Sequence, residues 1–431
     1  MSATHMLALV DCRHFYVSCE RLFSASVQSR PCIVLSNNDG CIVALDDDAR
    51  ALGLKRGMPL FQCRDVIERH GIQLFSSNYS LYQAVSDRVM TSLKPFALQV
   101  EPYSIVEAYL DVSHVAPDAL LEYGRVIRAT VLRQTGIPTS VSIAPTKTLS
   151  KIAHELAKKH PEHRDVISLA QLAESELDRL LAEVDIEDVW GIGPRYAERL
   201  RLHGIHTARD LKDADLAWVR RHLSVVGART VLELRGQACI PLEVQAKPKK
   251  GIMNAKTFGK PTDSLAQLEE AVATYTARAA EKLRRQDSLA SCVNVFVRTN
   301  PFQQDQPQYA NSISCRLPFP TAFTADVITV ALEALRLIYR PGYRYSKTGV
   351  FFSQIVPQAA LQFDLFGDYT LSEHVRKTRL MCVIDLLNTW FGRDTLFFGA
   401  QGIARDWQMR RSMLSPRATT SWEEIMVVHA D

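Results

Sequence analysis

Residues Leu7–Glu20 read LALVDCRHFYVSCE, and the predicted fold is organised around this stretch. Four consecutive apolar residues run directly into Asp11, a pattern that predicts a central strand buried on both faces. A carboxylate at the end of such a strand is costly to bury unless it has an ionic partner, a metal or hydrogen bonds. Asp11 is therefore a candidate metal ligand at the edge of a substrate pocket, beside the aromatic pair Phe15 and Tyr16. A second interpretation, in which Asp11 caps the following helix, stays open.

A β-hairpin is predicted directly after this stretch. Two short apolar runs, Cys32–Leu35 and Cys41–Leu45, flank the polar sequence Asn37–Gly40. Asp-Gly after Asn is a strong turn signal between two strands. The helix-compatible segment that follows carries Arg50, which is a candidate phosphate contact near the hairpin. The alternative for Arg50 is an ordinary surface charge.

The next region predicts an α/β sheet with helices behind it. A basic helix after the last of its strands carries Lys147, Lys151 and Lys158, whose spacings of four and seven place them on one helix face. Lys151 at the rim of the sheet is placed to neutralise a triphosphate, or else it is a solvated lysine. The other predicted elements are helices at Tyr79–Leu93 and Leu120–Gln134, and strands over 98–110 and Thr139–Ile143.

A glycine hairpin between two short helices is the most specific local signal for DNA. Gly191 and Gly193 precede Pro194, a residue favoured at the first position of a helix. Backbone N–H groups exposed at such a hairpin bind a phosphate without reading bases. Arg195, in the following helix, adds positive charge. The pattern predicts a DNA-binding helix-hairpin-helix, with an ordinary αα-hairpin as the alternative.

The charge of the chain is unevenly distributed. Its net charge is +4, but residues 245–350 contain 15 Lys and Arg against 8 Asp and Glu, so the remainder is net acidic. The proline-interrupted segment Gln245–Gly251 carries Lys249 and Lys250 and is predicted to be a linker lying against DNA. A basic module on an acidic body favours a phosphate backbone as partner, although a solvated basic face is the alternative. The module itself is predicted to be α+β, with helices at Leu265–Arg285 and Asp326–Tyr339.

Composition predicts a reduced, cytoplasmic protein of three or more domains. The 431 residues exceed what one hydrophobic core usually holds. Nine cysteines are scattered without a C-x-x-C pair, which is typical of free thiols. The sequence shows neither a secretory signal nor an apolar run of the roughly 18 residues that a membrane helix needs, so no membrane partner is expected.

Taken together, these motifs resemble the Y-family translesion DNA polymerases, and within them the UmuC type, which includes the catalytic subunit of bacterial DNA polymerase V. The resemblance covers essentially the whole chain. It is carried by VDCRHFYVSCE, SNNDGCIVA, FSSNYSLY, YSIVEAYLD, SIAPTKTLSKIA, VWGIGPR and QFDLF. It implies error-prone, template-directed DNA synthesis opposite damaged bases, in SOS mutagenesis and DNA repair.

The resemblance also implies a right-hand polymerase built from α/β and α+β domains. The implied parts are a palm (1–25 and 78–170), small fingers (26–77), a thumb with the helix-hairpin-helix (171–242), an α+β little finger (245–353), and a C-terminal tail with a clamp-binding motif and a partner-docking region (354–431).

The resemblance implies two Mg²⁺ ions at the active site. By motif position, Asp11 and Glu107 are metal carboxylates, and the backbone carbonyl of Cys12 helps to hold the nucleotide-side ion. The motif S-x-D-E, however, reads Ser104-Ile105-Val106-Glu107 here, so valine stands where an acid is expected. Asp111 cannot replace it, because four residues of strand place Asp111 roughly 13 Å away. The second ion is therefore expected to be weakly held.

Further residues are assigned to the nucleotide by the same resemblance. Tyr16 is at the sugar-gate position, where a bulky ring clashes with a ribose 2′-OH. Phe15, Arg50 and Lys151 fall where the family contacts the incoming dNTP. Asp47 stands where other members have a tyrosine, three residues before Arg50, and adds an anion there.

Two functional classes remain after this comparison of motifs. The first is an active translesion polymerase, which the resemblance favours. The second is a catalytically impaired member that keeps its DNA, clamp and partner surfaces, which Val106 favours. A third class, a nuclease, is disfavoured, because the hairpin is not accompanied by a cluster of acidic residues of the kind found in nuclease active sites.

The expected partners are primer–template DNA, dNTP, the sliding clamp, a processed UmuD dimer and RecA. A QFDLF pentapeptide in a polar tail is typical of a peptide that docks into a partner groove. The tail beyond Leu371 is predicted to dock proteins, with tryptophans at three positions as anchors. The clamp residues are predicted to be Gln362, Phe363, Leu365 and Phe366; the tryptophans are Trp390, Trp407 and Trp422.

Overall fold

The computed structural model describes residues 5–425, apart from 25–26, 28–29, 161–164, 246 and 364–368. The chain forms two compact units. The first contains residues 1–36, 40–246 and 413–431, and the second contains 37–39 and 247–412. No described helix is both long and apolar enough to cross a lipid bilayer.

Strand β1 (Leu7–Cys12) is the centre of a five-stranded sheet in the first unit, with the order β5-β6-β1-β7-β8. Both of its neighbours are antiparallel to it, and β1 is buried along almost its whole length, as its unbroken apolar run predicts. The other strands are β5 (Val100–Pro102), β6 (Glu107–Asp111), β7 (Thr139–Ala144) and β8 (Val166–Ser168).

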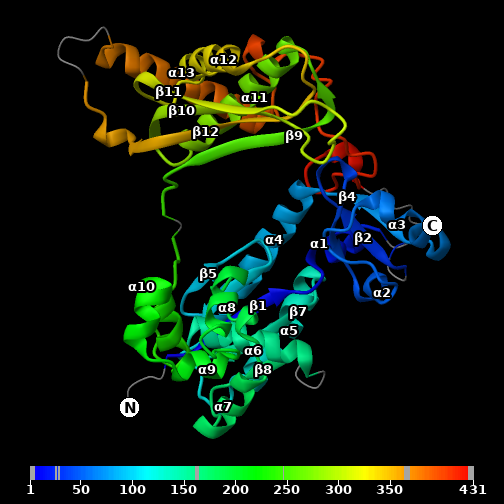
Figure 1. Cartoon of the computed structure of the whole chain (residues 1–431), viewed down its shortest axis with the longest axis vertical. Helices are drawn as coiled ribbons and strands as arrows, with labels where there is room; N and C mark the ends of the chain where they lie inside the picture. Colours follow the sequence, from blue (N-terminus) through cyan, green and yellow to red (C-terminus); the bar gives the residue numbers. More distant parts are fainter. Residues whose placement is uncertain are drawn as a thin grey trace. The chain divides into compact units, whose positions relative to one another are not determined.

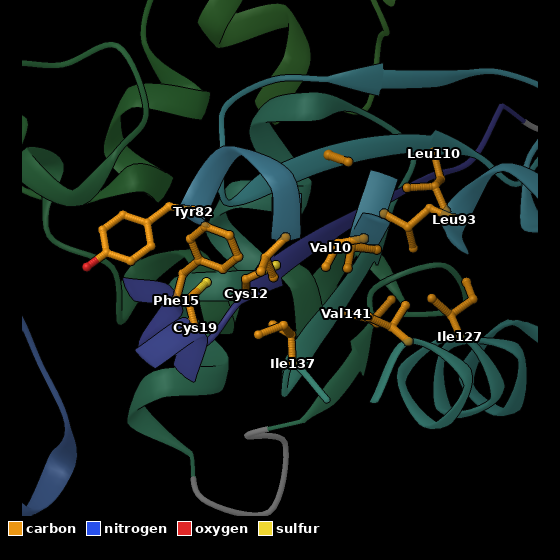
Figure 2. Close-up of a cluster of buried hydrophobic side chains, with 14 of the residues drawn as sticks. Val10, Cys12, Phe15, Cys19, Tyr82, Leu93, Leu110, Ile127, Ile137 and Val141 are labelled. Atoms are coloured by element: carbon orange, nitrogen blue, oxygen red, sulfur yellow. The ribbon is translucent and has the colours of Figure 1, made fainter. Parts of the chain in front are cut away.

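Alternation along β1 divides its side chains between two environments. Val10 and Cys12 enter a core with helices α1 (Phe15–Leu22), α4 (Tyr79–Leu93) and α5 (Leu120–Thr135), as Figure 2 shows. Asp11 points to the opposite face, which is covered by α6 (Lys147–Lys159).

The strand predicted over 98–110 is wrong as a single element, because it is two strands. A turn separates β5 from β6, and the Ser104 hydroxyl accepts the N–H groups of Val106 at 3.2 Å and Glu107 at 3.1 Å. This local side-chain bond satisfies two amides that a continuous strand would have paired across the sheet.

The predicted hairpin is confirmed. Strands β2 (Cys32–Leu35) and β3 (Ile42–Leu45) are antiparallel, and the turn between them places Asn38 and Asp39 at φ 62° and 52°. Asn and Asp tolerate this left-handed region better than most residues. The three-stranded sheet β3-β2-β4 is completed by β4 (Gln73–Ser76), and it carries α2 (Asp47–Ala51) and α3 (Leu60–His70).

A helical region follows the five-stranded sheet along the chain. Gly191, at φ 90°, adopts a conformation that favours glycine, and Pro194 opens the next helix as predicted. The helices are α7 (Glu174–Ala182), α8 (Pro194–Arg201), α9 (Ala208–Asp213) and α10 (Leu216–Leu234).

The second unit is an antiparallel sheet of order β11-β10-β12-β9 with helices α11 and α12 packed against it (Figure 1). The predicted α+β class is confirmed. The elements are β9 (Ile252–Thr262), α11 (Leu265–Arg284), β10 (Ser288–Thr299), β11 (Ala310–Thr321), α12 (Thr324–Ile338), β12 (Tyr345–Pro357) and α13 (Leu371–Trp390).

One of the three tryptophans predicted as interface anchors belongs to this core instead. Trp407 is buried among the residues of the four-stranded sheet and its helices, and its indole N–H donates to Glu270 at 3.2 Å. The prediction is therefore wrong for Trp407, whereas Trp390 and Trp422 are exposed. Residue type alone does not tell a buried indole from an exposed one.

Candidate active site

The two predicted carboxylates lie side by side. Asp11 and Glu107 are direct partners in the antiparallel register of β1 and β6, so their side chains project from the same face of the sheet. Asp11 is a strand residue, and His14 occupies the N-cap of α1, so the alternative in which Asp11 caps that helix is excluded. Asp111 pairs with Leu7 at the other end of β1, which confirms that it cannot take part in this site.

Burial and mutual repulsion dominate the electrostatics of the two acids. Burial, and then the neighbouring Glu107, raise the pKa of Asp11 to about 7. The Lys151 ammonium opposes this rise and binds Glu107, with 2.6 Å between Nζ and Oε1. The raised pKa means that ionised Asp11 has too little positive charge beside it. A divalent cation bound there would supply that charge.

We expect Asp11→Asn to stabilise the metal-free protein at high pH. The folded-state pKa of about 7 exceeds the ordinary 3.8, so ionised Asp11 costs stability, and this cost grows as pH rises from 3.8 to about 7. In EDTA at pH 8 the variant should melt at least about 4 °C higher than the parent, and the gain should shrink towards pH 4. Asp111→Asn, at the other end of the same strand pair, is the matched control. A gain that is independent of pH would contradict this reading.

His154 was missed by the sequence analysis although it belongs to the site. It lies one turn after Lys151 on α6, and its Nε2 is 3.9 Å from Asp11 Oδ1. Burial, and then the nearby lysines, lower its pKa to about 4, so the ring is neutral at physiological pH. The available signal was its spacing of three from Lys151, which places both side chains on one helix face.

These side chains line one cavity of about 1070 Å³ in the first unit. A cavity of this size accommodates a nucleotide-sized ligand. It brings together, from the sequence-predicted set, Asp11, Cys12, Phe15, Tyr16, Arg50, Glu107 and Lys151, with Val106 in the wall beside them.

The backbone around Val106 keeps an ordered geometry. The Val106 carbonyl accepts the Cys12 N–H at 2.9 Å, which joins the turn to the end of β1. Its half-buried side chain lines the cavity without offering a ligand atom. Among the described residues, no group of three or more His, Cys, Asp or Glu side chains is arranged to hold a metal ion. Glu101, on the neighbouring strand β5, does not replace the missing acid, because its carboxylate forms an ion pair with Lys147 at 2.5 Å.

Tyr16 is held by other aromatic rings. Its ring stacks on that of Tyr82, with centroids 4.3 Å apart and planes inclined by 14°. The Tyr79 ring packs edge-on against it, with centroids 6.2 Å apart. Tyr82 is completely buried, so the stack joins the cavity wall to the core of the first unit. Figure 2 labels Tyr82 and Phe15 within that core.

Arg50 forms an ion pair with Asp47, the residue that stands where the resemblance leads one to expect a tyrosine. Asp47 Oδ1 lies 3.4 Å from an Arg50 nitrogen, and Asp47 Oδ2 lies 3.2 Å from His14 Nε2 and 3.6 Å from Arg13. The Arg50 side chain remains 55% exposed, and surface ion pairs of this kind are weak. Arg50 can therefore leave Asp47 and turn towards a phosphate with little loss of free energy.

The remaining predicted residues lie outside the cavity. Gly191, Gly193 and Arg195 are exposed in the helical region. Lys249 and Lys250 are exposed just before β9. Gln362 is exposed and Phe363 is half-buried, whereas Leu365 and Phe366 lie outside the described residues.

Sequence comparisons relate the chain to known families. The impB/mucB/samB family matches residues 10–155, its C-terminal domain matches 249–365, and its HHH motif matches 174–205. A domain of unknown function matches 378–428. Protein UmuC of Salmonella typhimurium is 41% identical over 98% of this chain and 100% of its own length. Protein ImpB of the same organism is 39% identical over 97% of this chain and 99% of its own length.

Solved structures share the fold. A Y-family DNA polymerase chimera of Dbh and Dpo4 aligns with 82% of this chain and 99% of its own, at a TM-score of 0.63 and 24% identity. An insertion ternary complex of Dbh DNA polymerase aligns over the same shares at a TM-score of 0.53 and 22% identity. The resemblance to the UmuC type is confirmed: the chain belongs to the impB/mucB/samB family, to which UmuC also belongs, and it has the fold of a Y-family DNA polymerase.

Proposed function

We propose that the cavity beside β1 is a DNA polymerase active site whose metal-binding set lacks one acid. The observation that carries this proposal is the direct pairing of Asp11 with Glu107, with Val106 adjoining them in the cavity wall. Family membership supports the activity, and the valine supports impairment of nucleotide addition in this chain. Primer extension on a defined template with Mg²⁺, by this protein and by its Val106→Asp variant, tests both parts.

The donor set fits Mg²⁺, which prefers oxygen ligands. Asp11, Glu107 and the backbone carbonyl of Cys12 are the groups that would hold it. When bound, paired metal ions supply positive charge to the attacking and leaving oxygens of a phosphoryl transfer. Asp11 and Glu107 suffice to hold one ion, whereas a second ion would lack a carboxylate at position 106. Lys151 must release Glu107 before it can reach a triphosphate.

The other cavity residues bind and orient the nucleotide in this proposal. Arg50, on α2, and Lys151, on α6, contact the triphosphate. Phe15 and Tyr16 contact the sugar, and the Tyr16 ring excludes a ribose 2′-OH. The stack on Tyr82 supports this role, because a gate excludes a small group only if its ring is held still.

The domain boundaries are part of the proposal. We assign the palm to 1–25 and 78–170, the fingers to 26–77, the thumb to 171–242 and the little finger to 245–353, with a tail over 354–431. The family matches and the four groups of elements support this division, although β12 continues to Pro357.

We expect Lys249 and Lys250 to contribute to DNA binding through phosphate contacts. Replacing both by Gln should reduce the slope of log affinity against log salt concentration by about 2, since each phosphate contact contributes about 0.9. Fluorescence anisotropy with labelled primer–template measures this slope. The charge-matched control replaces the exposed Lys94 and Arg133, which lie outside the basic segment, and should leave the slope unchanged. Equal slopes for the two double variants would place the DNA contacts elsewhere.

The proposed partners are the sliding clamp, a processed UmuD dimer and RecA, in the cytoplasm. The exposed apolar side chains of α13 support docking of a protein on the tail. They include Leu380, Val383 and Leu386, and Trp390 at the end of the helix is 69% exposed. Contiguous exposed apolar residues of this kind mark interaction surfaces.

A further inference from the structure

The segment Met413–Ser415 pairs with the edge of the three-stranded sheet of the first unit. The Met413 carbonyl accepts the Ser76 N–H at 2.8 Å, and its N–H donates to Ser76 Oγ at 3.0 Å. Leu414 forms a parallel bridge with Ser76, the last residue of β4, and Met413 packs against the apolar core of that sheet. The segment therefore extends the ladder of β4 by strand addition.

Ser415, the next residue, is buried against the start of α4. Its Oγ accepts a hydrogen bond from Asn78 Nδ2 at 2.9 Å. Asn78 is the N-cap of α4, and its Oδ1 accepts the Leu81 N–H at 3.3 Å. The side chain of Asn78 thus joins the C-terminal segment to the first turn of the helix that carries Tyr82.

The Tyr82 hydroxyl is fixed from the other side by Glu20. Tyr82 donates to Glu20 Oε1 at 2.6 Å, and both side chains are almost completely buried. Glu20 lies one helical turn after Tyr16 on α1, the residue on which the Tyr82 ring stacks. Burial raises the pKa of Glu20, and the hydrogen bond from Tyr82 opposes that rise. Ser415 therefore acts on the Tyr82 ring through Asn78 and the first turn of α4, whereas Glu20 acts on it through the hydroxyl.

We infer that Ser415, Glu20 and Tyr82 are positioning residues for Tyr16, so that the C-terminal segment tunes the discrimination between deoxyribose and ribose. The inference rests on the proposed sugar-gate role of Tyr16. A steric gate works by repulsion, which changes steeply over fractions of an ångström, so its selectivity depends on how firmly the ring is supported. Ser415 lies in the region matched by the domain of unknown function, and this gives that region a role at the nucleotide.

The test measures binding without requiring chemistry, because Val106 is expected to slow insertion. The full-length protein is bound to a dideoxy-terminated primer–template with Mg²⁺. Dissociation constants of the correct dNTP and the matching rNTP are then measured by fluorescence. Tyr16→Ala should collapse the ratio of the two constants. Tyr82→Phe and Ser415→Ala should each lower it about threefold to tenfold, the usual effect of one hydrogen bond, mainly through tighter rNTP binding.

Two matched variants separate positioning from general stability. Glu20→Gln keeps an acceptor for the Tyr82 hydroxyl and should stay within about twofold of the parent ratio, whereas Glu20→Leu should behave as Tyr82→Phe does. Ser412→Ala removes a hydroxyl that donates to Asp39 at 2.9 Å, three residues earlier in the chain, and should leave the ratio unchanged. Melting temperatures verify that each variant is folded.

The outcomes distinguish the inference from the function on which it rests. Parent-like ratios for Tyr82→Phe and Ser415→Ala, with a collapsed ratio for Tyr16→Ala, overturn this inference alone. A parent-like ratio for Tyr16→Ala removes the gate role and overturns both. A reduced ratio for Ser412→Ala equal to that of Ser415→Ala also counts against a specific role of Ser415.

Discussion

Val106→Asp is expected to raise the rate of single-turnover dNTP insertion about 100-fold or more, with the affinity for primer–template unchanged. The carbonyl of Val106 already accepts a hydrogen bond from the Cys12 N–H at the end of β1. The substitution therefore adds a carboxylate to a backbone that is already held in place. The new carboxylate would join Asp11 and Glu107 in the cavity wall and would add a third acid to the residues that would hold the metal ions. Metal alignment would then depend on protein oxygens in place of water.

The same substitution should cost stability when no metal is present. A third acid beside Asp11, whose pKa burial and Glu107 already raise to about 7, adds repulsion that only a cation offsets. We therefore expect the melting temperature of Val106→Asp to fall in EDTA and to recover with Mg²⁺, more than that of the parent does. This second measurement reports metal binding independently of catalysis.

Ile105→Asp is the matched control for this prediction. Ile105 lines the same cavity one residue earlier, so the variant adds the same charge at a position that the motif does not use. It should not restore insertion. Equal insertion rates for the parent and Val106→Asp, at equal DNA occupancy, would show that Asp11 and Glu107 suffice. The proposed impairment would then be wrong.

The double substitution of Leu365 and Phe366 by Ala is expected to weaken binding to the sliding clamp about 100-fold or more. Each apolar anchor that is fully buried in a partner pocket contributes roughly 1.5–3 kcal/mol. Both residues lie outside the described part of the chain, and the expectation rests on the QFDLF sequence. Surface plasmon resonance with immobilised clamp measures the affinity.

Phe363 is expected to contribute less than the other two anchors. Its ring stacks on Tyr369, with centroids 6.1 Å apart, and lies 5.9 Å from His374. Binding a clamp pocket would exchange these contacts for new ones, so Phe363→Ala should cost less affinity than Leu365→Ala does. Phe302→Ala is the matched control, because this phenylalanine is 90% exposed and lies outside the motif. Unchanged affinity in the double variant would mean that QFDLF is an ordinary tail segment.

Local elements were readable from the sequence because their signals are local. The helix predicted over Tyr79–Leu93 has those bounds in the structure, since apolar residues at helical spacing need no distant partner to be recognised. The turn at Asn37–Gly40 was equally clear, because Asn and Asp accept the backbone conformation that it requires. Asp11 as the acid of the site followed from a buried strand that ends in a charge, together with the family motifs.

The tertiary structure alone decided which of these residues meet. Strand register pairs Asp11 with Glu107, and α6 brings His154 to the same cavity, although His154 carries no motif of its own. Trp407 is buried and Trp390 is exposed, a difference that depends on packing against other elements. The contact of Ser415 with Asn78, and through it with the support of Tyr16, joins segments that are 337 residues apart in the chain. Such contacts form only when folding closes long loops, and no sequence pattern within either segment records its partner.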